Sequence, residues 1–313
     1  MIALWVGFLA FVLAMLALDL GVFHRHSRVM NIPQALAWSA FWIFLALAFN
    51  GFVYFLYDSG GVPSSMTGGQ AAVVFFTAYV VEKSLSLDNL FVIAVIFRYF
   101  AIPRAQQHRV LFWGILGVLV LRAVMIALGS VLLARLWWVT YVFGTLLIAT
   151  AVRLLRAADH PIDVARNPIV RLAARLFPVS TRLEEGRFLD RSGPVIALTP
   201  LALALIAIEG CDLMFALDSI PAVLAITLDP FIVYTSNVFA VLGLRSLYFA
   251  LDGTIERFRH LRTAVTVVLG VVGVKLVLEH HLEIPTSTFL TLILAVLLAG
   301  VAASIYESSR APA

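Results

Sequence analysis

Apolar residues along this chain fall in long blocks that short polar stretches separate. Nine blocks can be recognised, and a block of about 20 residues crosses a hydrocarbon layer ~30 Å thick as an α-helix. Backbone groups in lipid must satisfy their own hydrogen bonds, and strand-like alternation is absent, so the blocks predict helices. We therefore expect an all-α, polytopic transmembrane bundle of nine helices. The expected helices cover residues 2–23, 35–57, 71–97, 110–133, 137–155, 195–221, 231–251, 264–278 and 288–306.

The composition agrees with a membrane protein. Of 313 residues, 62% are hydrophobic and 13% are charged, and the mean hydropathy is +1.00. A soluble domain has roughly half its residues apolar and about a quarter charged. The single cysteine, Cys211, excludes an internal disulfide framework and a multi-cysteine metal cluster. The net charge of +4 could indicate nucleic-acid binding in a soluble protein, but in a membrane chain basic residues mark cytoplasmic loops. We expect a lipid bilayer as partner, and no nucleic acid.

The basic residues orient the expected helices. Seventeen of the 22 lysines and arginines lie in loops on one side, whereas Arg135 alone lies on the other. The positive-inside rule then places the N-terminus outside and the C-terminus in the cytoplasm, in a bacterial inner membrane. The largest loop on the basic side, residues 156–194, contains a stretch at 169–177 in which arginines alternate with apolar residues. This stretch predicts a short amphipathic surface helix, although an ordinary basic linker fits the composition too.

Two parts of the chain resemble each other. Glu82 to Asp88 (EKSLSLD) aligns with Asp212 to Asp218 (DLMFALD), and matched residue pairs recur downstream at similar offsets of 122 and 123 residues. The loop charges make the third and sixth expected helices run in opposite directions. We therefore predict an inverted repeat of the third to fifth and the sixth to eighth helices, an architecture typical of transporters, although membrane proteins that transport nothing also contain repeats.

Ionisable residues inside the apolar blocks are the candidate functional groups. Each carboxylate costs at least ~2.5–3.5 kcal/mol at a helix centre, so together they should line a shared polar interior. The acids are Asp19, Glu82, Asp88, Glu209, Asp212 and Asp218; the expected counter-ions are Lys83, Arg122, Arg245 and Lys275; and Asn89, Ser219 and Asn237 could add neutral oxygens.

The charge balance of these groups favours a cation. The acids outnumber the bases, and a divalent ion would neutralise the excess. Oxygen ligands without thiolates suit Mn²⁺, Mg²⁺ or Ca²⁺. Internal ion pairing without transport is the alternative.

Helix geometry limits this prediction. Residues six apart, such as Glu82 and Asp88 or Asp212 and Asp218, differ by about 120° of rotation, so a regular helix does not direct both inward. Either one member of each pair binds elsewhere or the helix is interrupted. Pro221 favours an interruption in the sixth expected helix, whereas the third has no proline and the question stays open there. No phosphate loop, nucleophile elbow or paired-histidine motif is present, so we expect neither an enzyme nor a permanently bound cofactor.

These motifs resemble those of the TerC family of integral membrane proteins, in particular its Alx-like branch. The resemblance covers nearly the whole chain, which we interpret as one membrane domain over residues 1–313. It implies manganese efflux and metal homeostasis, with links to tellurium resistance and alkaline stress. By motif, it assigns metal handling to five acids and, less directly, to Asp19. The matching segments are LDLGVFHR (18–25), EKSLSLDN (82–89), IEGCDLMFALDSIPA (208–222), DPFIVYTSN (229–237) and LGLRSLY (242–248), and the five acids are Glu82, Asp88, Glu209, Asp212 and Asp218.

Two positions depart from the family pattern. Cys211 stands where threonine is usual, and Arg153 where lysine is usual.

The charge balance and the family resemblance together make export of Mn²⁺ the main hypothesis. The alternatives are a non-transporting scaffold that binds a cytoplasmic protein or a second copy of the chain through the loop 156–194, and an exporter of small organic cations.

Overall fold

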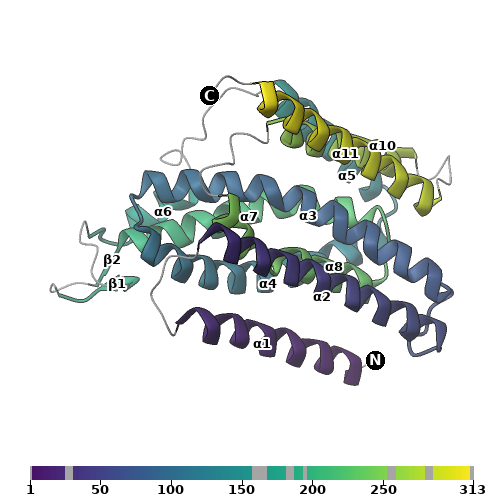
Figure 1. Ribbon diagram of the computed structural model, residues 1–313, viewed down its shortest axis with the longest axis horizontal. Helices are drawn as coiled ribbons and strands as arrows, with labels where there is room; N and C mark the ends of the chain where they lie inside the picture. Colours follow the sequence, from purple (N-terminus) through teal and green to yellow (C-terminus); the bar gives the residue numbers. More distant parts are fainter. Residues whose placement is uncertain are drawn as a thin grey trace.

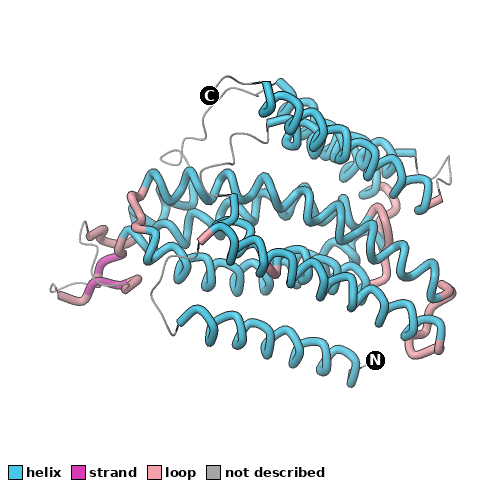
Figure 2. The backbone as a smooth tube through the Cα atoms, viewed as in Figure 1, coloured by secondary structure: helices cyan, strands magenta, loops and turns pink. Residues whose placement is uncertain are grey.

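Helices dominate the computed structural model, which describes residues 2–24, 31–156, 168–180, 187–192, 196–251, 259–278 and 285–310 (Figure 2). The predicted all-α class is confirmed. Six described segments, one of which is α8 and α9 taken together, are long and apolar enough to cross a membrane, and the total of nine stays a prediction. The elements are α1 (Ile2–His24), α2 (Ile32–Asp58), α3 (Gly68–Tyr99), α4 (Arg104–Arg135), α5 (Val139–Arg156), α6 (Pro168–Leu176), β1 (Leu189–Asp190), β2 (Ala197–Leu198), α7 (Pro200–Leu224), α8 (Pro230–Val241), α9 (Leu244–Leu251), α10 (Arg259–Leu278) and α11 (Thr286–Arg310).

Polar caps set where several helices begin. Thr67 starts α3 in a capping box with Gln70, each side chain bonding the other residue's backbone N–H. Thr199 and Asp229 cap α7 and α8, and each is followed by a proline, which suits the first helical position. The apolar blocks supply the length of the helices, and these caps fix their ends.

Four helices form the centre of the molecule. Helix α3 packs against α7 and α8, and α4 packs against the same two helices. Around them, α2 covers α3 and α9, while α5, α10 and α11 form a separate layer and α1 lies along the opposite edge (Figure 1). The backbones of α5 and α10 approach closely, since a Cβ at Gly144 would lie 2.9 Å from the carbonyl oxygen of Gly273.

The central helices run in opposed pairs. Successive contacts of Gly114 with Ile208 and of Gly129 with Leu224 show that α4 and α7 are parallel. Helix α8 begins beside the end of α2, where Tyr57 Oη donates to Asp229 Oδ2 at 2.8 Å, so α8 runs parallel to α3. Because α3 and α4 form an antiparallel hairpin, α3 opposes α7 and α4 opposes α8 (Figure 1). Helices α5 and α10 are antiparallel too.

The expected helix 231–251 is two helices, because the chain breaks after Leu242. Gly243 adopts a φ of +84°, a left-handed conformation that residues with a Cβ rarely take. A Cβ there would lie 2.8 Å from the Trp42 side chain, so the turn also needs glycine for space. By contrast, α7 continues through Pro221 to Leu224 without interruption, because the proline lies in the last turn of the helix.

One end of the bundle carries the only strands of the described residues, the short antiparallel pair β1 and β2, together with α6 (Figure 2). Helix α6 confirms the predicted amphipathic segment. Its Val170 and Ala173 are buried, and its Leu172 and Leu176 are exposed. This is also the end at which α3 stops and α4 and α7 begin.

Candidate functional site

A buried guanidinium joins the four central helices. Arg122 of α4, with 1% of its side chain exposed, donates to Glu82 Oε2 of α3 at 2.5 Å and to Asp212 Oδ1 of α7 at 3.2 Å. It also donates to Asn237 Oδ1 of α8 at 3.2 Å. Glu82 is fully buried and Asp212 is 5% exposed. We call these four residues the Arg122 cluster.

The cluster brings together residues that the sequence singled out. Its two acids belong to the two segments that resemble each other, and they come from antiparallel helices. Asn89 Nδ2 adds a long hydrogen bond of 3.4 Å to Asp212 Oδ1. Burying such charges is costly unless they pair, and here one base serves two acids. The formal charge of the cluster is therefore −1.

Each acid of the cluster keeps one oxygen that is not hydrogen-bonded within the described chain. These atoms are Glu82 Oε1 and Asp212 Oδ2, and both are buried. The Asn237 Nδ2 and Arg122 Nε atoms are likewise unsatisfied there. Buried polar atoms in proteins nearly always have a partner, so a cation, a proton or water would find acceptors at these two oxygens.

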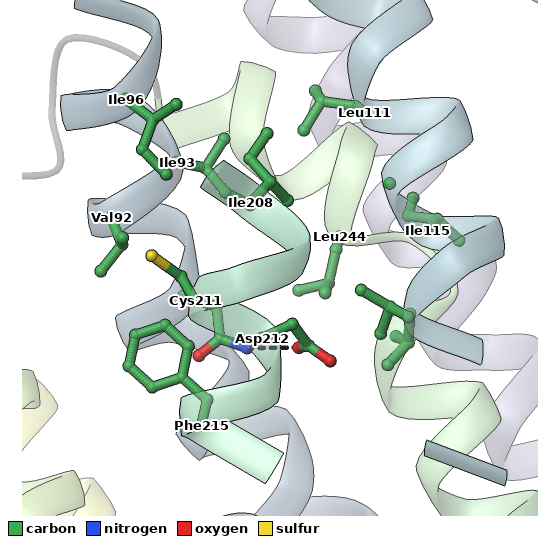
Figure 3. A pocket seen from close by; sticks show the side chains of 14 residues that line it. Val92, Ile93, Ile96, Leu111, Ile115, Ile208, Cys211, Asp212, Phe215 and Leu244 are labelled. Atoms are coloured by element: carbon green, nitrogen blue, oxygen red, sulfur yellow. Dashed lines mark hydrogen bonds between the residues drawn. The ribbon is translucent and has the colours of Figure 1, made fainter. Parts of the chain in front are cut away.

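A narrow cavity of about 30 Å³ leads to Asp212. It extends from Ile96 and Leu111, close to the loop between α3 and α4, down to Asp212. Its walls come from α3, α4 and α7 and from the break between α8 and α9, which contributes Val241 and Leu244 (Figure 3). A space of this size holds about two water molecules. Its walls are almost wholly apolar, and Asn89 and Asp212 are its polar groups beside Cys211.

The other acids lie outside the cluster. Glu209, one helical turn before Asp212, is partly exposed and makes no hydrogen bond or ion pair with any residue of the described segments. Asp218 accepts a hydrogen bond of 3.0 Å from Thr150 Oγ1 of α5. Because α7 is continuous, Asp218 is the member of its pair that binds elsewhere. Ser219 is buried beside it, and its Oγ has no partner among the described residues.

Two of the six acids cannot be placed. Asp19 lies on α1 and Asp88 on α3, but their side chains are outside the described part of the structure. Within that part, no three carboxylate, histidine or cysteine side chains group closely enough to hold a metal ion. The described acids thus supply a pair of facing carboxylates and two separate ones.

The two lysines that were expected as counter-ions contact helix ends. Lys83 Nζ donates to the carbonyl oxygens of Ala240 at 3.2 Å and Leu242 at 3.5 Å, where α8 stops. Lys275 Nζ donates to Ala225 O at the end of α7. Positive charge is favourable at a helix C-terminus. Arg245 is 2% exposed, in the first turn of α9.

Sequence reasoning missed three features of this region. These are the break after Leu242, the Thr150 partner of Asp218, and the position of Glu209, whose carboxylate lies against the backbone of α4 at Gly117. The glycine in an apolar block was the available signal for the break. The other two contacts depend on packing between helices, and no residue pattern within one helix reveals them.

Comparisons with known proteins agree with the membrane character of the chain. Residues 67–311 match the family described as "Integral membrane protein TerC family". The "Uncharacterized membrane protein STKORF319" of Myxococcus xanthus is 45% identical, over 99% of this chain and 94% of its own. A membrane protein of Rickettsia bellii is 38% identical, over 97% and 98% of the two chains. The Escherichia coli (strain K12) protein "Putative membrane-bound redox modulator Alx" is 40% identical, over 94% and 91%. No solved structure matches the chain.

Proposed function

Because the chain belongs to the TerC family of integral membrane proteins, we propose that it exports a divalent cation, most readily Mn²⁺, through the Arg122 cluster. The observation that carries this proposal is the pair of facing acids. Glu82 and Asp212 are buried on opposed helices, share one guanidinium, and each keep a buried oxygen open. Intramembrane ionisable residues of this kind commonly mark ion pathways.

The charge of the site suits a doubly positive substrate. The Arg122 cluster has a formal charge of −1. With Glu209 on the adjacent turn of α7, the formal charge of the site becomes −2. One divalent ion neutralises that charge. Carboxylate and amide oxygens are ligands for hard cations such as Mn²⁺, which agrees with a site built from Glu82, Asp212 and Asn89.

The arrangement of the helices supports an inverted repeat. Each of α3, α4 and α5 has an antiparallel counterpart, namely α7, the α8–α9 pair and α10. Helix α3 packs on α8 as α4 packs on α7. Transporters with inverted repeats bind substrate where the halves meet, and discontinuous helices such as α8–α9 commonly line that site. We infer that the two halves rock against each other to open the cluster to either side.

The loop charges indicate which side of the membrane the cavity faces. The cavity that reaches Asp212 starts beside the loop between α3 and α4, which is flanked by Arg98 in the last turn of α3 and Arg104 at the start of α4. Basic loops face the cytoplasm, so this cavity is the cytoplasmic approach to the site. A cation that moves from the cytoplasm toward the middle of the membrane along α7 passes the level of Glu209 before that of Asp212.

The alternatives fit the site less well. A cavity of about 30 Å³ is too small for an organic cation of amino-acid size. A scaffold function does not require buried acids whose oxygens lack a hydrogen-bond partner. Binding of a partner at α6 and its loop is compatible with either function. A redox role like the one in the name of the Escherichia coli relative cannot rest on an internal pair of thiols in this chain, because Cys211 is its only cysteine.

Manganese flux into proteoliposomes that contain an encapsulated metal indicator tests the proposal. Wild type should transport Mn²⁺, whereas Glu82→Gln and Asp212→Asn should each lower the initial rate at least about tenfold, since each removes a charged ligand. Glu307→Gln is the matched control, because Glu307 is exposed on α11 and pairs with His260. Equal rates for wild type and all three variants would reject the site.

A further inference from the structure

We propose that Gly117 of α4 is a positioning residue that seats the carboxylate of Glu209 beside the cation path. A Cβ built on Gly117 would lie 2.1 Å from Glu209 Oε1, 2.5 Å from its Cδ and 2.7 Å from its Oε2. These separations are far shorter than van der Waals contacts. The Glu209 carboxylate therefore occupies the volume that any side chain at position 117 would take.

The space left by the missing side chain of Gly117 explains how Glu209 keeps its position without a partner among the described residues. Glu209 has no hydrogen bond or ion pair within the described segments, so no polar contact there fixes its rotamer. It shares a face of α7 with Asp212, three residues further on. Their like charges repel, and the groove over Gly117 gives the carboxylate a place against α4.

The space beside Gly117 lies close to the proposed substrate path. Gly114, Ile115 and Val118 of α4 line the cavity, as do Ile208, Cys211 and Asp212 of α7. Gly117 and Glu209 do not line the cavity themselves, but each is next in sequence to a residue that does, namely Val118 and Ile208. Glu209 therefore lies beside the cavity wall, about 4.5 Å of helix rise before Asp212. There it can bind an incoming cation first, or join Asp212 as the second carboxylate around one ion.

The structure provides a matched control on another helix. A Cβ at Gly51, in the middle of α2, would meet no atom within 4 Å beyond its own helix backbone. Gly51→Ala and Gly117→Ala therefore change helix propensity alike, but only the second displaces a carboxylate. The displaced atoms are the end of a flexible side chain, so Gly117→Ala should fold, with a midpoint of thermal unfolding no lower than that of wild type.

The inference rests on the proposed function, and the test is Mn²⁺ transport measured as KM and kcat. Gly117→Ala should raise KM about tenfold, in the range for losing one contact to a charged group, with a smaller effect on kcat. Gly51→Ala should match wild type. Replacing Glu209 by the shorter aspartate in the Gly117→Ala background should restore much of the affinity, because its carboxylate ends one methylene further from α4.

A double-mutant cycle separates positioning from general damage. If Gly117 acts through Glu209, then Gly117→Ala should add nothing in a Glu209→Ala background. A wild-type KM for Gly117→Ala, or an effect that persists without Glu209, would overturn the inference. If Glu209→Ala and Asp212→Asn both leave transport unchanged, the proposed function fails. If both impair transport and Gly117→Ala does not, only the role of Gly117 fails.

Discussion

Removing the guanidinium of Arg122 should destabilise the fold more than removing either acid that it binds. Arg122→Met keeps most of the volume and apolar stem but leaves Glu82 and Asp212 buried and facing each other without a base. Removing one partner of a buried ion pair lowers the free energy of unfolding by about 3–5 kcal/mol. Here one substitution takes hydrogen bonds from three acceptors on three helices. We therefore expect a loss at the upper end of that range.

The loss should be reversed in part by removing a second charge. In Arg122→Met with Glu82→Gln, only one buried carboxylate remains, so the double variant should unfold at a higher free energy than Arg122→Met alone. The assay is reversible unfolding of the purified protein in detergent micelles. Arg135→Met is the control, because Arg135 is exposed at the end of the same helix.

A divalent cation should also rescue the Arg122→Met variant. Ligand binding stabilises the folded state by RT ln(1 + [L]/Kd), so tighter binding gives the larger shift. With the competing guanidinium gone, Mn²⁺ should stabilise Arg122→Met more than wild type at equal concentration. The reasoning is refuted if Arg122→Met is as stable as Arg135→Met, or if adding Glu82→Gln destabilises it further.

Three further predictions concern the break between α8 and α9 and the cap of α8, each measured as unfolding free energy in detergent. Gly243→Ala should cost about 2 kcal/mol or more, from the left-handed φ and the contact with Trp42, whereas Gly69→Ala, which meets open space, should be near neutral. Lys83→Met should cost about 1–3 kcal/mol, because it leaves two carbonyls at the break without their donor. Asp229→Ala should cost about 1–2 kcal/mol through the lost N-cap of α8 and the lost hydrogen bond from Tyr57, and a wild-type value would mean that neither contributes.

The helices were predictable because lipid-length apolar blocks leave the backbone little choice. Every block that the sequence marked overlaps a helix, and the amphipathic α6 lies where its arginines and leucines alternate. The break after Leu242 was not predictable in the same way. A glycine within an apolar block is compatible with a straight transmembrane helix, and only the approach of Trp42 from α2 makes the left-handed turn necessary.

The centre of the site was predictable from the cost of burying charge. We expected charged side chains such as those of Glu82, Asp212 and Arg122 to pair inside the bundle, because each is too polar to face lipid alone. The surroundings of Asp218 and Glu209 could not be predicted in this way. The first depends on how α5 rotates Thr150 toward α7, and the second on the missing side chain of Gly117.

Anomalous X-ray scattering from crystals grown with Mn²⁺ measures most directly whether the facing acids hold the substrate. The account predicts a manganese peak beside Glu82 Oε1 and Asp212 Oδ2, absent in crystals of Asp212→Asn. A manganese peak elsewhere in the protein with those two oxygens bound only to water, or the same peak in the variant, would contradict it.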